Sequence, residues 1–172
     1  STIYYYISQL MKNLVIIPTF NEIENISNII NAVLNKKDNF HILIVDDQSP
    51  DGTASKVIEI MQSNRERLFI EQRSEKSGLG SAYIHGFKWA IERKYDYIFE
   101  MDADFSHNPD DLSRLLQNCI HNKADVSIGS RYVSGGKILN WPKNRYLLSY
   151  YASLYVRVIL GIKIKDTTAG FK

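Results

Sequence analysis

The sequence predicts an α/β fold in which helices flank a mostly parallel sheet. Short apolar runs rich in isoleucine and valine alternate along the chain with segments whose apolar residues recur at helical spacing. The runs have the length of strands that are buried on both faces, and turn-forming residues follow them. Such alternation builds right-handed crossover units, so we expect the loops after the strands to form the working surface at one edge of the sheet.

Each expected element rests on one of these patterns. The strands are expected at 14–17, 42–45, 68–71, 97–101 and 125–129. Between the first two, apolar residues recur at helical spacing over 26–34, with Asn21 as the expected N-cap. Further helices are expected over 54–62 and 79–93, and Pro109 opens another at a position that its missing N–H tolerates.

The apolar segment 146–164 is interrupted by Arg157 and Lys163. It is predicted either as an amphipathic helix at a membrane interface, where tyrosines and long cationic side chains are common, or as a segment packed on the sheet or on another part of the protein. Both interpretations stay open. The sequence has no uninterrupted run of about 18 apolar residues, so it predicts no membrane-spanning segment.

Length and composition indicate one globular domain. We place it at 13–172, after a lead-in at 1–12 that does not have the pattern of a signal peptide. Hydrophobic residues at 44% and charged residues at 23% exclude a disordered or collagen-like chain. The single cysteine, Cys119, excludes a disulfide scaffold and a zinc site built from cysteines.

The charges are distributed unevenly. A net charge of +2 is too small to indicate nucleic-acid binding. However, residues 1–122 carry 12 Lys and Arg against 17 Asp and Glu, whereas residues 123–172 carry 9 against 2. This asymmetry predicts two chemically different partners, unless it is a chance distribution of solvated surface charge.

Two carboxylates, Asp102 and Asp104, follow the strand expected at 97–101 and flank Ala103. They would repel each other unless a cation lay between them. Two hard oxygen ligands suit Mg²⁺ or Mn²⁺, which take their remaining ligands from water and phosphate oxygens. A bound cation would neutralise a departing diphosphate. The alternative is an exposed acidic turn without metal.

The segment 46–53 ends the second expected strand with further acidic residues. Asp46 or Asp47 could accept hydrogen bonds from a nucleotide base or ribose, whereas 51–53 has the pattern of a turn that starts a helix. Neither a complete G-x-G-x-x-G nor a P-loop pattern is present, which excludes a Rossmann dehydrogenase and a P-loop NTPase. Gly78 and Gly80 before a helix are weak evidence for phosphate binding.

Five segments taken together resemble the family 2 glycosyltransferases, in particular the branch that mannosylates dolichyl or polyprenyl phosphates. These segments are Pro18-Thr19-Phe20-Asn21-Glu22, 46–53, 78–87, Asp102-Ala103-Asp104 and Gly129-Ser130-Arg131-Tyr132. The resemblance covers 13–172. It implies a GT-A fold and inverting transfer of mannose from GDP-mannose to a polyprenyl phosphate. It also implies a Mg²⁺ or Mn²⁺ cofactor and a cytoplasmic protein, peripheral at the cytosolic membrane face.

The resemblance also implies the site residues. Nucleotide-sugar contacts fall on Pro18, Phe20, Glu22, Val45, Asp47, Asp102, Ala103 and Asp104. The metal falls on Asp102 and Asp104, the acceptor phosphate on Arg131, Arg145 and Ser149, and the catalytic roles on Asp104 and Arg131. Four positions depart from the family pattern. Phe20 stands where many relatives have tyrosine, and Ser106 where some have a metal-binding glutamine. Gln48 replaces a usual glycine, and Tyr150 replaces a frequent basic residue after Ser149.

Three alternatives remain. The donor could be a UDP-sugar. Alternatively, the chain could bind nucleotide sugars without turnover. The reason is that 166–172 resembles a motif from the middle of the family's domain, so the chain is expected to be truncated at its C-terminus. A phosphatase with a D-x-D nucleophile is disfavoured, since such carboxylates follow an early strand and these follow the fourth. Arg131 and Arg145 could also pair with acids that stabilise the fold.

Overall fold

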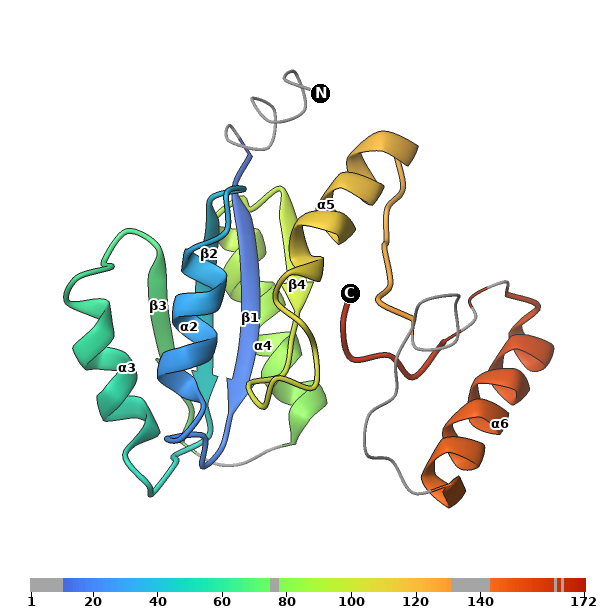
Figure 1. Ribbon diagram of the computed structural model, residues 1–172, viewed down its shortest axis with the longest axis horizontal. Helices are drawn as coiled ribbons and strands as arrows, with labels where there is room; N and C mark the ends of the chain where they lie inside the picture. The colour runs from blue at the N-terminus through green and yellow to red at the C-terminus, as the bar shows by residue number, and fades with distance from the viewer. Residues whose placement is uncertain (1–10, 75–77, 131–142, 163, 165) are drawn as a thin grey trace.

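The computed structural model describes residues 11–74, 78–130, 143–162, 164 and 166–172 (Figure 1). The strands in these residues are β1 (Asn13–Thr19), β2 (Phe40–Asp46), β3 (Leu68–Gln72) and β4 (Tyr97–Glu100). The helices are α2 (Ile26–Leu34), α3 (Thr53–Met61), α4 (Leu79–Glu92), α5 (Asp111–Asn122) and α6 (Lys143–Leu160). Strands and helices alternate up to α5, as the sequence predicts.

The four strands form one parallel sheet in the order β3-β2-β1-β4. In the central pair, Asn13 lies opposite Phe40 and Pro18 lies opposite Val45. The chain therefore adds strands to one side of β1 and then returns to place β4 on its other side. All four strands point the same way, so the loops that follow them meet at one edge (Figure 1).

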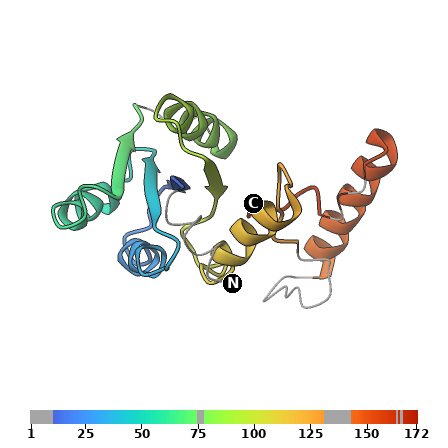
Figure 2. The ribbon, with the colours of Figure 1, turned by 90° about the horizontal axis from the view of Figure 1, so that it is seen from above.

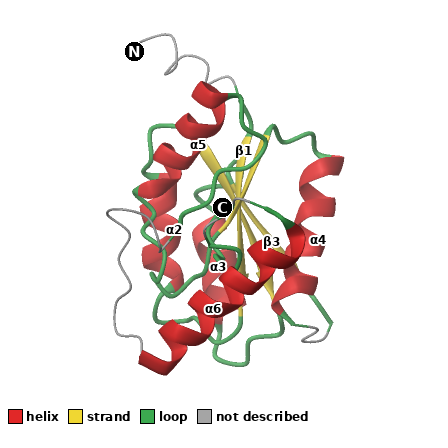
Figure 3. Cartoon of the chain, turned by 90° about the vertical axis from the view of Figure 1, so that its right-hand side faces the viewer, coloured by secondary structure: helices red, strands yellow, loops and turns green. Residues whose placement is uncertain are grey.

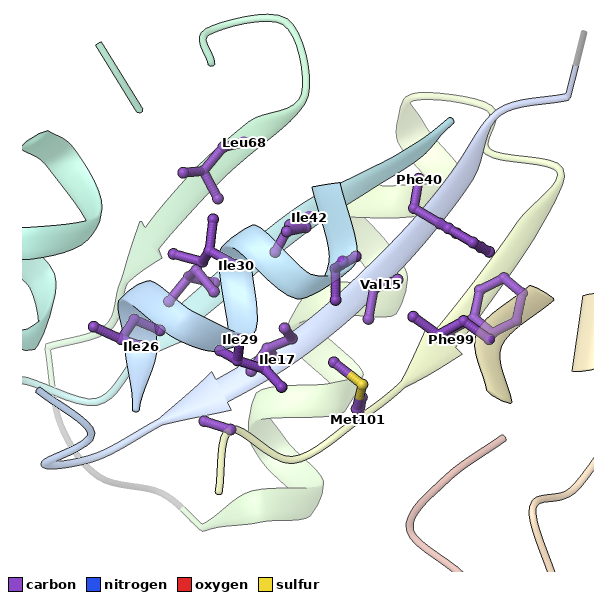
Figure 4. Close-up of a cluster of buried hydrophobic side chains, with 14 of the residues drawn as sticks. Val15, Ile17, Ile26, Ile29, Ile30, Phe40, Ile42, Leu68, Phe99 and Met101 are labelled. Atoms are coloured by element: carbon purple, nitrogen blue, oxygen red, sulfur yellow. The ribbon is translucent and has the colours of Figure 1, made fainter. Parts of the chain in front are cut away.

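Helices cover both faces of this sheet (Figure 2). Side chains of β1 alternate between the two faces: Val15 and Ile17 pack with residues of α2, α3 and α5, whereas Leu14 and Ile16 pack with residues of α4. Figure 4 shows the first cluster, in which Ile26, Ile29 and Ile30 of α2 lie against β1 and β2. The predicted mostly parallel α/β fold flanked by helices is confirmed.

Gly86 allows α4 to approach β1 closely. A Cβ atom at this position would lie 2.7 Å from Cγ2 and 2.9 Å from Cδ1 of Ile16, a fully buried side chain. We therefore expect Gly86→Ala to lower the free energy of unfolding by about 1–3 kcal/mol, measured by urea denaturation. The control is Gly80→Ala in the same helix, where nothing lies within 4 Å and stability should not fall. Equal stability of the two variants would contradict this packing.

The fifth strand expected at 125–129 is wrong for the described residues. The C-terminal segment lies between this stretch and β4 instead: Glu100 N–H donates to the Lys172 carbonyl at 2.7 Å, and Gly129 N–H donates to the Phe171 carbonyl at 2.9 Å. The Lys172 ammonium also pairs with Glu100 at 2.8 Å. Gly129 thus has its backbone partner in the C-terminal segment, and the residues of 125–129 alone give no sign of this pairing.

The N-cap expected at Asn21 is also wrong. Helix α2 begins at Ile26 after Asn25, and Asn21 has a positive φ of 60° in the preceding loop. The Glu22 carbonyl accepts the N–H groups of Asn25 and Ile26 at 3.0 and 2.8 Å. The chain between β1 and α2 is therefore longer than predicted, which leaves 20–25 at the carboxyl edge of the sheet.

Helix α6 confirms a helix in the apolar segment expected at 146–164. It lies outside the layered part of the molecule in Figures 1 and 2, and Figure 3 shows it crossing in front of that part. Many of its apolar side chains are exposed, among them Leu148, Tyr155 and Ile159. Among the helices of the described residues, none is both long and apolar enough to cross a membrane.

Candidate active site

The candidate site lies where β1 and β4 end side by side. The sheet changes its direction of growth between these two strands, and ligands of open α/β sheets bind at such a switch point outside the carboxyl ends of the strands. Asp102 and Asp104 follow β4, and Pro18, Phe20 and Glu22 lie at the end of β1 and in the loop after it. The topology therefore brings the predicted metal residues and part of the predicted nucleotide residues to one edge.

Asp102 is held by neighbours from two directions. The Tyr83 hydroxyl, on α4, donates to Asp102 Oδ1 at 3.3 Å. The backbone N–H of Asp102 donates to His107 Nδ1 at 3.2 Å, and this imidazole stacks on Phe171 with ring centroids 5.1 Å apart. A Cβ on Gly170 would lie 3.7 Å from Asp102 Oδ2, so the C-terminal segment also borders the site.

The two carboxylates differ in environment. Burial raises the pKa of Asp102, His107 opposes this effect, and the charge of Asp104 adds to it. Asp104 is exposed, and although burial opposes the change, hydrogen bonds from Ser106 lower the pKa of its carboxyl. One of these bonds is the Ser106 backbone N–H donating to Asp104 Oδ1 at 2.9 Å. A cation beside both carboxylates would relieve the repulsion that acts on Asp102.

The donor set fits a cation that keeps most of its ligands outside the protein. Within the described residues, no group of three or more His, Cys, Asp or Glu side chains is placed to hold a metal ion. Asp102 and Asp104 could supply two oxygens, and the remaining ligands would have to come from water and a bound diphosphate. Mg²⁺ and Mn²⁺ are bound in this way, whereas a protein-enclosed zinc site needs more side chains.

The acidic residues at the end of β2 and after it, Asp46, Asp47 and Asp51, have different partners. Asp46 is buried, and its carboxylate accepts hydrogen bonds from Thr19 Oγ1 at 2.9 Å and from Ser49 N–H at 3.0 Å. Asp51 accepts from Thr53 N–H at 2.9 Å at the start of α3, as expected for a turn that opens a helix. Both side chains thus hold loops in place. Asp47, the predicted nucleotide residue of this segment, is also buried and pairs with Arg73.

The other predicted nucleotide residues differ in how exposed their side chains are. Phe20 is 39% exposed, and Glu22 Oε2 accepts from the Asn25 side chain at 3.0 Å. Val45 and Ala103 are buried in the core, so their side chains are not available to a ligand. A groove of about 450 Å³ opens beside the loop after β1 and is lined by Asn21, Ile23, Glu24, Asn25, Pro50 and Asp51.

The predicted acceptor residues lie in or near the second part of the chain. Arg131 falls outside the described residues, and Arg145 belongs to α6 but its side chain is not among those described. Ser149 Oγ lies 2.9 Å from Thr168 Oγ1, so α6 contacts the C-terminal segment, whose Phe171 stacks on His107. The structure thus ties Ser149 to a segment that borders the metal candidates, and it does not test the two arginines.

Two neighbours of the site, Tyr83 and Arg73, were missed by reasoning from the sequence. Tyr83 lies in the glycine-containing segment, where it received no role of its own. Arg73 follows β3 and pairs with Asp47. A cation directly after one strand, with an unexplained aspartate directly after the preceding strand, is the signal that could have suggested this pair.

A parallel α/β sheet with acidic side chains at its switch point is typical of domains that bind nucleotides at this edge. Residues 14–171 match the family described as glycosyl transferase family 2, which is nearly the whole chain. The chain therefore belongs to glycosyl transferase family 2, and the resemblance read from its motifs is confirmed.

Within this family, the chain is similar to three curated proteins. The chain is 47% identical over 161 residues to the polyprenol monophosphomannose synthase of Mycolicibacterium smegmatis and 44% identical over 162 residues to the undecaprenyl-phosphate mannosyltransferase of Micrococcus luteus. It is 41% identical over 165 residues to the dolichol-phosphate mannosyltransferase of Pyrococcus furiosus. Each match covers 94% of this chain, but 60%, 65% and 45% of the respective relative. The chain thus spans about half to two thirds of their length.

Solved structures agree on the fold. The glucosyl-3-phosphoglycerate synthase of Mycobacterium tuberculosis, in complex with UDP, superposes with a TM-score of 0.61 over 99% of this chain and 59% of its own, at 15% identity. TarS (residues 1–349) of S. aureus, in complex with UDP-GlcNAc, gives a TM-score of 0.52 over 67% of this chain and 33% of its own, at 25% identity. These neighbours support the predicted GT-A type of nucleotide-sugar-binding fold.

Proposed function

We propose that the protein transfers mannose from GDP-mannose to a dolichyl or polyprenyl phosphate, with inversion at the sugar carbon and with Mg²⁺ or Mn²⁺. The observation that carries this proposal is the placement of Asp102 and Asp104 at the switch point of the sheet. The three mannosyl-transferring relatives support the sugar and the lipid phosphate, because their names specify both.

The reaction forms a bond between an acceptor phosphate oxygen and the anomeric carbon of mannose, and it breaks the bond from that carbon to the diphosphate. The electron pair of the broken bond leaves with GDP. A phosphomonoester has a second pKa of about 6, so at neutral pH it is largely dianionic and needs no strong general base. The principal task of the protein is to hold two anions close to one carbon, within about 3–3.5 Å of it on the attacking side.

Charged groups of the two parts of the chain would share this task. Asp102 and Asp104 would hold the divalent cation, which when bound neutralises the charge of the leaving diphosphate. Arg131, Arg145 and Ser149 would bind the acceptor phosphate, because a guanidinium fork holds two phosphate oxygens and stays charged. The acidic first part and the basic second part of the sequence fit these two tasks.

A UDP-sugar donor is the second candidate. The structural neighbour bound to UDP-GlcNAc favours it, although this neighbour aligns with only 67% of the chain. Binding without turnover is the third candidate, because the mannosyl-transferring relatives are longer than this chain.

The decisive experiment compares GDP-mannose, UDP-glucose and UDP-N-acetylglucosamine as donors to a short polyprenyl phosphate with Mn²⁺. We expect a product only from GDP-mannose, detected by mass spectrometry as polyprenyl phosphomannose. Product from a UDP-sugar alone would reject the mannose donor. Nucleotide binding without product from any donor would favour the third candidate.

We also propose that the protein acts peripherally at the cytosolic membrane face and that α6 contacts the lipid. Leu148, Tyr155 and Ile159 are 74%, 67% and 62% exposed, and their spacing of seven and four residues puts them on one side of α6. An exposed apolar helix side in a basic part of the chain suits an anionic membrane surface.

Charge on this side of α6 is expected to prevent membrane binding. Leu148→Glu combined with Ile159→Glu should lower the fraction of protein that sediments with vesicles of anionic phospholipids by about tenfold or more, because burying each apolar side chain contributes about 1.5–3 kcal/mol. Ile91→Glu on α4, where the isoleucine is 68% exposed, is the matched control and should bind as the wild type does. Unchanged sedimentation of the double variant would contradict the role of α6.

A further inference from the structure

Tyr83 on α4 places a hydroxyl group beside the candidate metal site. This hydroxyl donates to Asp102 Oδ1 at 3.3 Å, and it comes from a different element of the fold, because Asp102 follows β4. The rest of the tyrosine is buried: Tyr83 is 7% exposed and belongs to the same buried cluster as Leu14 and Ile16 of β1. Tyr83 therefore connects the core of the sheet with one of the two carboxylates.

The packing of α4 fixes the position of this hydroxyl. Gly86 lies one turn after Tyr83 on the same side of the helix and lets α4 approach Ile16 closely. The ring of Tyr83 also contacts Phe87, with ring centroids 6.5 Å apart. A tyrosine side chain has two main rotatable bonds, so a packed ring leaves its hydroxyl little freedom. The segment 78–87 thus directs a hydrogen-bond donor to the end of β4.

The backbone of Asp102 is held from another direction. Its N–H donates to His107 Nδ1 at 3.2 Å, and the His107 ring stacks on Phe171. With the backbone held in this way, the direction of the carboxylate depends on the two side-chain torsions of Asp102. The hydrogen bond from Tyr83 restricts these torsions.

The hydroxyl of Tyr83 keeps its proton at neutral pH, because a tyrosine has an ordinary pKa of about 10 and burial raises the pKa of Tyr83. A carboxylate oxygen that accepts one hydrogen bond still has a second acceptor position for a cation. Loss of a group that hydrogen-bonds to a metal ligand typically lowers metal affinity by about 10- to 100-fold. The 3.3 Å separation is longer than the usual length of about 2.7–2.8 Å, so we expect an effect at the lower end of this range.

We propose that Tyr83 is a positioning residue for the divalent cation, which holds the Asp102 carboxylate in the orientation that metal binding requires. This inference rests on the proposed function, because it takes a cation at Asp102 and Asp104 as given. Tyr83 acts through Asp102 and is not itself a metal ligand. A phenylalanine at this position would therefore be sufficient for the fold but not for full metal affinity.

The test removes this hydroxyl alone. Tyr83→Phe keeps the buried ring, so it should fold as the wild type does, judged by circular dichroism, and bind GDP in EDTA with unchanged affinity in calorimetric titrations. Its dissociation constant for Mn²⁺ should rise about tenfold, measured with saturating GDP by electron paramagnetic resonance of the free ion. The matched control is Tyr95→Phe. Tyr95 precedes β4 at the opposite edge of the sheet, where its hydroxyl lies 2.9 Å from His41 Nδ1, so this variant should keep the wild-type affinity for Mn²⁺.

The possible outcomes separate the inference from the proposed function. A wild-type affinity for Mn²⁺ in Tyr83→Phe, or an equal loss in Tyr95→Phe, would overturn the positioning role alone. A Tyr83→Phe protein that does not fold, or that binds GDP in EDTA equally weakly, would also overturn it, because the hydroxyl would then serve the fold. A wild-type protein whose GDP binding does not respond to Mn²⁺ would overturn the proposed metal dependence together with the inference.

Discussion

Replacing Asp104 with asparagine is expected to abolish the strengthening of GDP binding by Mn²⁺ and to lower mannosyl transfer by about 10²–10³-fold. The amide has the same shape but lacks the charged oxygen that a hard cation requires. Asp104 is exposed, and hydrogen bonds from Ser106 lower the pKa of its carboxyl despite the effect of burial, so it is ionised at neutral pH. Calorimetric titration of GDP with and without Mn²⁺ measures the first effect.

The matched control for this variant is Asp111→Asn. Asp111 lies in the first turn of α5, where it pairs with the exposed Arg114. Its replacement should leave both metal-dependent binding and transfer unchanged. Since Asp104 makes its described hydrogen bonds within its own loop, Asp104→Asn should also unfold at nearly the wild-type temperature. An undiminished effect of Mn²⁺ in Asp104→Asn would count against the metal assignment.

Replacing Arg131 with alanine is expected to lower transfer to a short polyprenyl phosphate by about 10²-fold or more, with GDP binding unchanged. The acceptor phosphate has to approach a donor diphosphate of the same sign, and a guanidinium fork offsets this repulsion on the acceptor side. The effect should therefore fall on transfer and not on nucleotide affinity. Product formation and calorimetric GDP titration separate the two.

Arg131→Lys and Arg114→Ala serve as comparisons. Lysine keeps the charge but loses the planar fork, so Arg131→Lys should recover only part of the transfer. Arg114 is an arginine whose side chain is 72% exposed on α5, and its replacement should leave transfer intact. Transfer by Arg131→Ala at the wild-type rate would reject the acceptor role of Arg131, which rests on the sequence resemblance.

The strands β1 and β2 could be predicted well because the residues within each strand are enough to identify it. The apolar runs that became β1 and β2 are buried on both faces, so their composition alone distinguishes them from the helices. The stretch 125–129 failed for the opposite reason. Its backbone partner is Phe171, a residue more than 40 positions away, and local composition carries no information on such pairing.

The carboxylates of the candidate site could be predicted from the sequence, but the side chains that hydrogen-bond to them could not. Asp102 and Asp104 could be found because two acidic residues follow an apolar strand. The hydroxyl of Tyr83 reaches Asp102 from α4, and Arg73 reaches Asp47 from the neighbouring strand end. Both contacts depend on the order of strands in the sheet, which a single sequence does not specify. The local pattern also left Asp46 and Asp47 equivalent, and only the resemblance to the family singled out Asp47.

The central claim is that Asp102 and Asp104 hold the diphosphate of a GDP-sugar through a divalent cation. A crystal structure with Mn²⁺ and GDP-mannose, recorded near the manganese absorption edge, tests it most directly. We expect an anomalous peak at about 2.0–2.3 Å from carboxylate oxygens of both aspartates and from oxygens of the diphosphate. A manganese peak away from both aspartates, or a nucleotide bound elsewhere than at the carboxyl edge of β1 and β4, would contradict the claim.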